Sequence, residues 1–242
     1  MLQSVRRQFD AQRDFVLGKL DTVPVTNNFT PKQRKAWLDD VVDWSLFDDN
    51  MRKVLAPILL SLIADAGKVA VQQVGLDPSL FTVFNQSVQD YMRERSTKIA
   101  KDVNDETEKQ LRATLSQGIQ AGETTFELRA RIEGVFGFAA TTRADRIART
   151  ESTRATSFAD IEGWDQSGVV EGKEWYTALD ERTCPWCRDL HGRVVPLKTN
   201  YFNKGDVMEV DGKTMTVSYD DMPGCPAHVN CRCVLLPVLI EG

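Results

Sequence analysis

The first two thirds of the chain place apolar residues at helical spacing. One set recurs at intervals of three, four or their sums, which puts its members on one side of a helix: Leu80, Phe84, Val88, Tyr91, Ile99, Val103, Leu111 and Leu115. Asp77-Pro78 is predicted to open this helix, the longest in the chain, and Gly118 and Gly122 to end it.

Capping residues and stop signals predict four further helices. One begins at Thr30-Pro31 and reaches about Phe47, and the next runs from near Asp49 towards Gly75 with a tolerated Pro57. The other two follow capping threonines. They run from Thr124 to the stretch 134–137, and from Thr142 to about Ser167 with Gly168 as the stop.

After Gly168 the pattern changes to that of short strands. Residues 173–179 form a predicted strand, and 207–210 with 214–218 form a predicted hairpin around Asp211-Gly212. A closing strand is expected over 233–240 despite Pro237. The fold class is therefore α+β, a mainly helical N-terminal body followed by a small, loop-rich β module.

Composition and charge narrow the class of protein. Hydrophobic residues make up 42% of the 242 residues and charged residues 27%, as in ordinary globular proteins. The formal net charge of -5 gives no global positive field to attract nucleic acid or anionic lipid. The longest apolar run, 54–64, is too short for a membrane helix and the N-terminus has no secretory pattern, so we expect a soluble protein made in a reducing cytoplasm.

The chemistry of the chain is concentrated in its last quarter. All five cysteines and both histidines fall between Cys184 and Cys233. Cys-x-x-Cys turns bring two sulfurs to one point, and four ligands complete a tetrahedron around zinc. The favoured set is Cys184, Cys187, His228 and Cys231, with Cys233 as the close rival, Cys225 as the third choice and His191 also within reach.

The cluster has alternatives to a structural zinc site. A redox Cys-x-x-Cys pair would start a helix, whereas Val194, Val195 and Pro196 follow this one without helical periodicity. Buried core thiols are the plainest alternative. The signatures of nucleic-acid deaminases and of His-Glu-x-x-His metalloproteases are absent, so a closed structural site is favoured over a catalytic one.

Glu151 falls in the middle of the apolar face of the predicted helix 143–167. Burial of an unpaired carboxylate is costly, so we predict that an arginine, Arg154 or Arg232, ties Glu151 and its helix to the β module. The alternative is a glutamate at the edge of a loosely packed helix.

The same helix is locally basic. Arg143, Arg146 and Arg149 could contact nucleic-acid phosphate, and Trp164 and Trp175 could stack on bases or belong to the core. The alternative is a solvated face on which the arginines are balanced by acidic residues, namely Asp145, Glu151 and Asp160.

An ordered series of motifs resembles one known family. The series contains Arg149-Thr150-Glu151-Ser152, Lys173-Glu174-Trp175, the stretch from Asp180 to Cys187, Leu190-His191-Gly192 and the stretch from His228 to Cys233. It is similar to the phage Mu F-like minor head proteins, also called phage head morphogenesis proteins, over roughly residues 105–237. Pro223-Gly224-Cys225-Pro226 departs from the family, in which a Pro-Pro pair is commoner ahead of the histidine.

The resemblance implies two domains, a helical region over 1–104 and a head morphogenesis domain over 105–242. In the second, helices would extend to about 168 and a zinc-stapled β module would cover 169–242. The motif positions carried over from the family are Glu151, Trp175, Asp180, Cys184, Cys187, Gly192, His228, Cys231, Arg232 and Cys233.

The resemblance also implies a role. The chain would be a minor capsid protein and not an enzyme, present in few copies in the procapsid and virion, in the capsid interior or at the portal vertex. Its partners would be the portal protein or scaffold and, as a weaker contact, packaged DNA, with no membrane and no small-molecule substrate. Two alternatives stay open, a zinc-dependent enzyme acting on nucleic acid, with Asp180, Glu181 or Asp189 as its acid or base, and a zinc-ribbon binding module.

Overall fold

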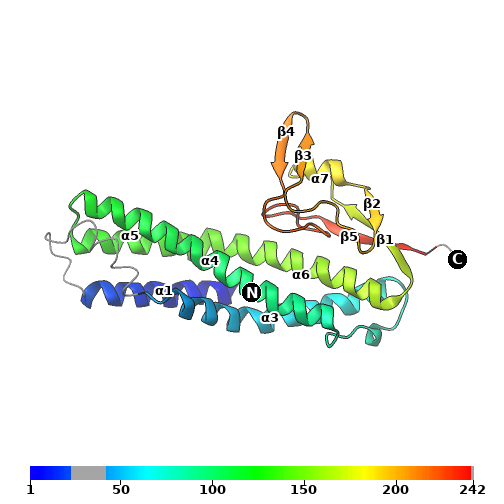
Figure 1. The fold of residues 1–242 in the computed structure, drawn as a ribbon, viewed down its shortest axis with the longest axis horizontal. Helices are drawn as coiled ribbons and strands as arrows, with labels where there is room; N and C mark the ends of the chain where they lie inside the picture. The colour runs from blue at the N-terminus through cyan, green and yellow to red at the C-terminus, as the bar shows by residue number, and fades with distance from the viewer. Residues whose placement is uncertain (23–41, 241–242) are drawn as a thin grey trace. The chain divides into compact units, whose positions relative to one another are not determined.

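The fold combines long helices with two small antiparallel sheets in a computed structural model that describes residues 1–22 and 42–240 (Figure 1). The elements follow in the order α1 (Leu2–Thr22), α3 (Trp44–Gln73), η1 (Pro78–Leu80), α4 (Gln86–Gln120), α5 (Thr125–Phe138), η2 (Ala139–Arg143), α6 (Ala144–Ser167), β1 (Val170–Tyr176), α7 (Pro185–Leu190), β2 (Val194–Pro196), β3 (Val207–Val210), β4 (Lys213–Thr216) and β5 (Val234–Leu239). The α+β class expected from the sequence is confirmed.

The chain divides into two compact units, and each unit is built from two separate stretches. The first contains 1–58 and 92–148, and the second contains 59–91 and 149–242. The unit boundaries fall inside α3, α4 and α6, because these long helices contribute residues to both. Residue 104, the predicted end of the first domain, lies within α4 in the first unit.

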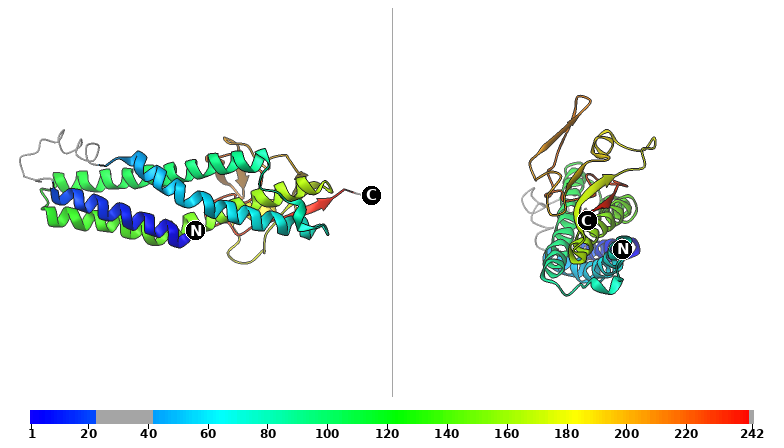
Figure 2. Two further views of the ribbon diagram at one scale, coloured as in Figure 1. Left: turned by 90° about the horizontal axis from the view of Figure 1, so that it is seen from below. Right: turned by 90° about the vertical axis from the view of Figure 1, so that its right-hand side faces the viewer.

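The first unit is a helical assembly. α1 lies beside α5, as both figures show (Figures 1 and 2), and its residues Val5, Phe9 and Val16 are fully buried. A buried hydrogen bond from Gln12 Nε2 to Asn104 Oδ1, 2.9 Å long, joins α1 to α4. The apolar spacing that predicted helices therefore also supplies the core.

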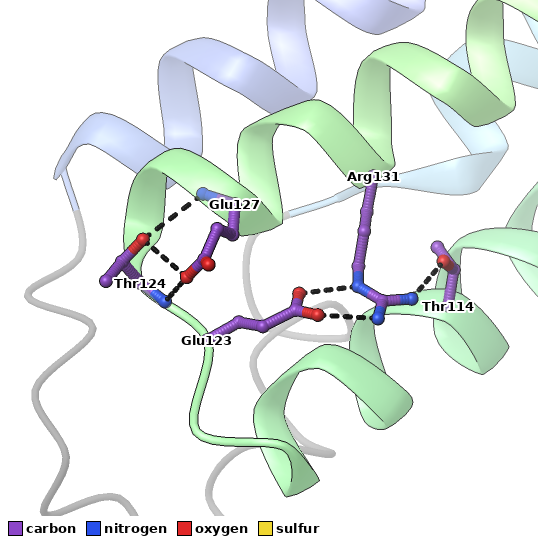
Figure 3. Close-up of polar contacts among 5 residues, drawn as sticks. All are labelled: Thr114, Glu123, Thr124, Glu127 and Arg131. Atoms are coloured by element: carbon purple, nitrogen blue, oxygen red, sulfur yellow. Dashed lines mark hydrogen bonds and ion pairs between the residues drawn. The ribbon is translucent and has the colours of Figure 1, made fainter.

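The capping threonine of α5 behaves as the sequence predicts. Thr124 Oγ1 accepts a hydrogen bond from the Glu127 N–H, and the Glu127 carboxylate accepts one from the Thr124 N–H at 2.7 Å (Figure 3). Arg131 then clamps Glu123, which precedes the cap, and also donates to Thr114 of α4. These bonds fix the turn between α4 and α5.

Two helix boundaries differ from the sequence prediction. Asp77 caps only the three-residue η1, and the long helix begins at Gln86, so Leu80 and Phe84 lie outside it and are 51% and 88% exposed. Gly118 lies inside α4, whereas Gly122 follows its end with φ +75°.

The helix predicted from Thr142 to about Ser167 is present as α6, but Thr142 lies inside a continuous helical stretch and does not cap it. α5 and α6 are joined by the π-helical turn η2, and no side-chain cap is found at its start. Thr141 Oγ1 donates back to the Gly137 carbonyl at 2.7 Å, which is the way a threonine satisfies its hydroxyl inside a helix. The helix stop at Gly168 is found as predicted, with φ +70°.

α3 begins at Trp44 and runs through Pro57 to Gln73, so no new helix starts near Asp49. The predicted helix from Thr30 lies mostly outside the described residues. By length and composition α3 could cross a membrane. Of its most apolar 18-residue segment, 33% is buried. Core helices of soluble proteins pass the same test, and Leu55, Leu59 and Ile63 are fully buried, so the absence of membrane contact stays a prediction.

In the second unit β1 is the central strand of a three-stranded antiparallel sheet with the order β2-β1-β5 (Figure 1). Trp175 pairs with Leu235 of β5, and Pro237 is tolerated because β5 is an edge strand. The predicted hairpin is present as β3 and β4, with Asp211 and Gly212 both at positive φ in its turn.

Gly163 of α6 and Gly67 of α3 let two helices approach closely within the second unit. A Cβ atom added at Gly163 would lie 2.7 Å from the Gly67 carbonyl oxygen and 3.0 Å from the Ala70 Cβ. Because backbone atoms cannot move aside as a flexible side chain can, the helices would have to separate.

We expect Gly163→Ala to lower the free energy of unfolding by about 1–3 kcal/mol, the usual cost of overpacking. Gly134→Ala is the matched control: it also lies inside a helix, but its Cβ would meet nothing within 4 Å. It should raise stability by roughly 0.5–1 kcal/mol because alanine favours the helix. Chemical denaturation of both variants checks this, and equal effects would contradict the close approach.

Candidate metal centre

The Cys-x-x-Cys pair is positioned by the short helix α7. Cys184 is the N-cap residue, and its Sγ accepts a hydrogen bond from the Cys187 N–H at 3.3 Å. Pro185 occupies the first helical position, where its missing N–H costs nothing. The pair does start a helix, which the sequence did not predict, but α7 has only six residues and Val194–Pro196 form strand β2, in line with their lack of helical periodicity.

The other donors of the cluster begin in a turn over residues 228–231, which places His228 next to α7. The Cys231 N–H donates to the His228 carbonyl at 3.1 Å, and Asn230 adopts a left-handed conformation with φ +63°. The Asn230 N–H donates to Thr150 Oγ1 of α6 at 3.4 Å. The turn is thus attached to α6 as well as to the sheet.

These two segments bring sulfur and nitrogen donors together. His228 Nε2 lies 3.0 Å from Cys184 Sγ and 3.3 Å from Cys187 Sγ. Cys187 Sγ lies 3.7 Å from Cys231 Sγ. For tetrahedral zinc, metal–ligand bonds of about 2.3 Å to sulfur and about 2.0 Å to nitrogen imply S···S separations of about 3.8 Å and S···N separations of about 3.6 Å. The S···S distance matches such a site, whereas both S···N distances are shorter than the ideal one, so a bound ion would move the His228 ring slightly away from the two sulfurs.

The donors form two groups of three that share one sulfur. Cys184, Cys187 and His228 form one group, and Cys187, Cys231 and Cys233 form the other, with all ligand atoms of each group within 4.8 Å of one another. The favoured four-ligand set draws Cys231 from the second group. Cys187 is therefore a ligand in both groups and in the favoured four-ligand set.

The histidine tautomer suits a metal ligand. His228 Nδ1 lies 2.8 Å from the Val229 carbonyl oxygen. A carbonyl can only accept, so Nδ1 carries the proton and the Nε2 lone pair faces the two sulfurs. His191, the further candidate, instead accepts a hydrogen bond at Nδ1 from the Thr177 N–H at 3.2 Å, away from both groups.

Crowding of the thiols makes their full ionisation dependent on a cation. Hydrogen bonds to Cys231 and Cys233 raise the pKa of Cys187, and burial raises the pKa of Cys225. Hydrogen bonds donated by Cys187 lower the pKa of Cys231 and of Cys233. Neighbouring thiolates repel one another, and a bound divalent ion would remove that repulsion.

Arg232 forms a two-pronged ion pair between the two ligand-bearing segments. Its guanidinium donates to both carboxylate oxygens of Asp180, at 2.9 and 2.5 Å. Asp180 also accepts from the Arg182 N–H and the Thr183 hydroxyl, and the hydrogen bond from Arg232 is the main cause that lowers the pKa of Asp180. This pair joins the segment before Cys184 to the segment between Cys231 and Cys233.

Glu151 is buried and lies beside Arg154 on its own helix. Arg154 Nε is 3.8 Å from Glu151 Oε2, and the guanidinium carbon lies 5.5 Å from the ring centroid of Tyr219 in the β module. Arg232, the other arginine considered for this role, is engaged by Asp180. Tyr219 was not foreseen, because only the folded chain shows which ring meets Arg154.

A hydrogen bond between Gly192 and Trp175 joins the turn after α7 to strand β1. Gly192 has φ +80°, a conformation that favours glycine, and its N–H donates to the Trp175 carbonyl at 2.8 Å. Trp175 is fully buried, and its ring meets Tyr201 edge-on at 5.2 Å. Trp175 and the equally buried Trp164 thus belong to the core and cannot stack on bases.

Lys173 is an unexpected member of this core. Its side chain is fully buried in β1, and Nζ donates to the Leu197 carbonyl. Burial lowers the pKa of Lys173 to about 8. The sequence placed Lys173 in a strand but gave no sign of its burial, because lysine almost always lies at the surface.

The three arginines considered for nucleic acid do not share one environment. Arg143 turns inward, donating to Thr107 Oγ1 and to the Val103 carbonyl, both at 3.1 Å, with its guanidinium over the ring of Phe9. Arg143 is therefore not part of an exposed basic face. Arg146 and Arg149 are exposed.

Asp160 of α6 is the acidic residue whose environment is most unusual. It has no ion-pair or hydrogen-bond partner among residues 1–22 and 42–240, and burial raises its pKa to about 7. A carboxylate whose pKa is higher in the folded than in the unfolded state weakens the fold as pH rises from its unfolded pKa, near 4, to about 7.

We expect Asp160→Asn to raise the free energy of unfolding at pH 8, by up to about 4 kcal/mol for a shift of about three pKa units. The gain should shrink as pH falls from 8 to 5.5. Thermal unfolding of the variant across this range measures it, and Asp65→Asn, the same substitution at an exposed position of α3, is the matched control. A pH-independent effect would contradict the assigned cause.

Comparison with known proteins gives three results. A family model described as "Phage Mu protein F like protein" matches residues 109–236. An uncharacterized protein of Bacillus subtilis (strain 168), YqbB, is 23% identical over 196 residues, which cover 80% of this chain and 62% of that protein. The chain thus spans less than two thirds of this relative's length. No solved structure matches the chain.

Proposed function

Because the chain belongs to the family of phage Mu protein F-like proteins, we propose that it is a minor head protein of a tailed phage, built in few copies into the procapsid. The observation that carries this proposal is the family match, which covers more than half of the chain. The match runs from within α4 to within β5 and includes every cysteine and histidine of the cluster. The family supports a role in phage head morphogenesis.

We further propose that the main partner is a protein, the portal or the scaffold, and that the chain lies inside the capsid or at the portal vertex. The net charge of -5 supports this choice, since an acidic chain is poorly suited to bind DNA as its principal ligand. In the mature particle the same contacts would keep the chain in the virion.

The Cys and His cluster is proposed to bind zinc in a structural role. Cys184, Cys187 and His228 would supply three ligands, and Cys231 or Cys233 the fourth. Zinc would provide coordinate bonds that join α7 to the turn after His228. A small β module has few core residues of its own, so such bonds contribute much of its stability.

A role without catalysis is proposed because Asp180 is not placed as a free acid or base. Asp180, the first candidate of the enzyme alternative, is held by Arg232 and Thr183, and its lowered pKa keeps it ionised. A general acid needs a pKa near the working pH. Asp180 therefore serves the fold in this account.

The proposal is tested on purified procapsids and virions of the phage that encodes the chain. Quantitative mass spectrometry should find the chain in the procapsid at a small fraction of the copy number of the major capsid protein. Particles from a mutant phage that lacks the gene provide the background signal. Absence of the chain from both procapsid and virion would defeat the proposal.

DNA is proposed as a lesser contact, through the exposed Arg146 and Arg149. Changing both to glutamate should weaken binding of duplex DNA at low salt. Loss of two phosphate contacts should also make the salt dependence shallower, by about 1.8 in the slope of log K against log salt. Unchanged affinity at low salt would remove DNA from the proposal.

A further inference from the structure

The three-stranded sheet has one face that is not covered by the described chain. Antiparallel partners lie on the same face, so the register defines it: Glu174 pairs with Leu236 and Val194, Tyr176 with Val234, and Gly172 with Val238 and Pro196. The opposite face carries Trp175, Leu235 and Lys173, which are buried in the core. We call the first set the open face.

The open face is apolar where a solvated sheet face is usually polar. Its large side chains are well exposed: Tyr176 by 44%, Val194 by 52%, Val234 by 49% and Leu236 by 38%. They come from all three strands, so they form one surface and not scattered single residues. Contiguous exposed apolar surface rimmed by polar groups marks interaction sites.

The surface is also held in shape. Tyr176 packs against the His191 ring with centroids 5.1 Å apart, and the Thr177 N–H holds that ring through Nδ1. Beneath the face, Tyr201 donates its hydroxyl proton to the Lys173 carbonyl of the central strand at 2.8 Å. A rigid surface loses little side-chain freedom when a partner covers it.

The carboxylate of Glu174 restricts which kind of partner can cover the open face. Glu174 is half-buried in the middle of the open face, between Val194 and Leu236, and has no ion-pair partner among the described residues. A partner that covers the face must bring a cation to this carboxylate or leave it desolvated and unpaired. Two copies related by a two-fold axis would place Glu174 against Glu174, which opposes self-association through this face.

We propose that the open face of the sheet β2-β1-β5 docks another head protein, through an apolar surface that sets a lysine or arginine against Glu174. This inference rests on the proposed function, since it names the surface by which the chain is retained in the head. The metal cluster then has an indirect role, because it holds the module that presents the face.

The experiment measures how much of the chain enters purified procapsids. Leu236→Asp should lower the amount per procapsid about tenfold or more, as expected for a charge in the centre of an interface. Glu174→Arg should lower it similarly, and Glu174→Gln less. Val207→Asp is the matched control, because Val207 is 56% exposed in β3 but lies outside the open face. Its incorporation should stay at the wild-type amount.

Each outcome has one reading. Wild-type chain in procapsids together with full retention of both Leu236→Asp and Glu174→Arg overturns the docking surface and leaves the proposed function standing. Absence of the wild-type chain defeats the proposed function itself. If Leu236→Asp lowers the thermal unfolding midpoint, Val194→Asp takes its place. A wild-type dimer in sedimentation that Leu236→Asp dissociates would show a second copy as the occupant and overturn the proposal.

Discussion

Replacing Cys187 with serine is expected to release the metal and unfold the β module, the largest effect of any single substitution in this chain. Cys187 is the one sulfur shared by both ligand groups, so its loss leaves neither group of three complete. Structural zinc contributes apparent binding free energies of about 10–16 kcal/mol in small modules, which is comparable to the total stability of a domain. The variant should lose zinc by elemental analysis and become sensitive to proteolysis after Gly168.

The matched control is Cys225→Ala. Cys225 is equally buried, with 3% of its surface exposed, but belongs to neither ligand group. It should keep the metal and lose only about 1 kcal/mol, as for a small core truncation. Zinc retained at the wild-type level in Cys187→Ser, with unchanged protease resistance, would contradict the metal-stabilised module.

Trp175→Ala is expected to have the second largest effect, a loss of about 3–5 kcal/mol in the free energy of unfolding. Trp175 is fully buried in the central strand, pairs with Leu235 and meets Tyr201 edge-on. Truncation would leave a cavity at the point where β1 and β5 meet the core. Denaturant unfolding followed by circular dichroism measures the loss.

The neighbouring Tyr176→Ala supplies the control for Trp175→Ala. Tyr176 lies on the same strand but on the opposite face and is 44% exposed, so its truncation should cost less than about 1 kcal/mol. The two effects must differ if the strand has one buried and one open face. Equal losses would contradict the assigned register.

Local signals in the sequence predicted the elements whose ends depend on nearby residues. The Thr124 capping box, the Gly168 stop and the Asp211-Gly212 turn are all found, because each depends on bonds or φ values within a few residues. The start of α4 was missed by eight residues for the opposite reason. Asp77 can cap the first turn of a short or a long helix equally well. Only tertiary packing decides whether the chain continues as a helix after that turn.

The candidate site was predictable in composition but not in detail. Spacing alone indicated that thiols and His228 would converge, and the structure brings five of these donors together. Their division into two groups depends on the α7 cap at Cys184 and on the left-handed Asn230, neither of which the spacing reveals. Likewise Arg232 pairs with Asp180 because the turn before Cys184 places that carboxylate within its reach.

X-ray absorption at the zinc edge, on wild-type protein purified without chelators, tests the central claim most directly. A structural site of this kind should hold one zinc per chain, with sulfur ligands at about 2.3 Å and one imidazole nitrogen at about 2.0–2.1 Å. Protein that is folded and protease-resistant yet holds no zinc, or holds it through oxygen ligands alone, would contradict the account.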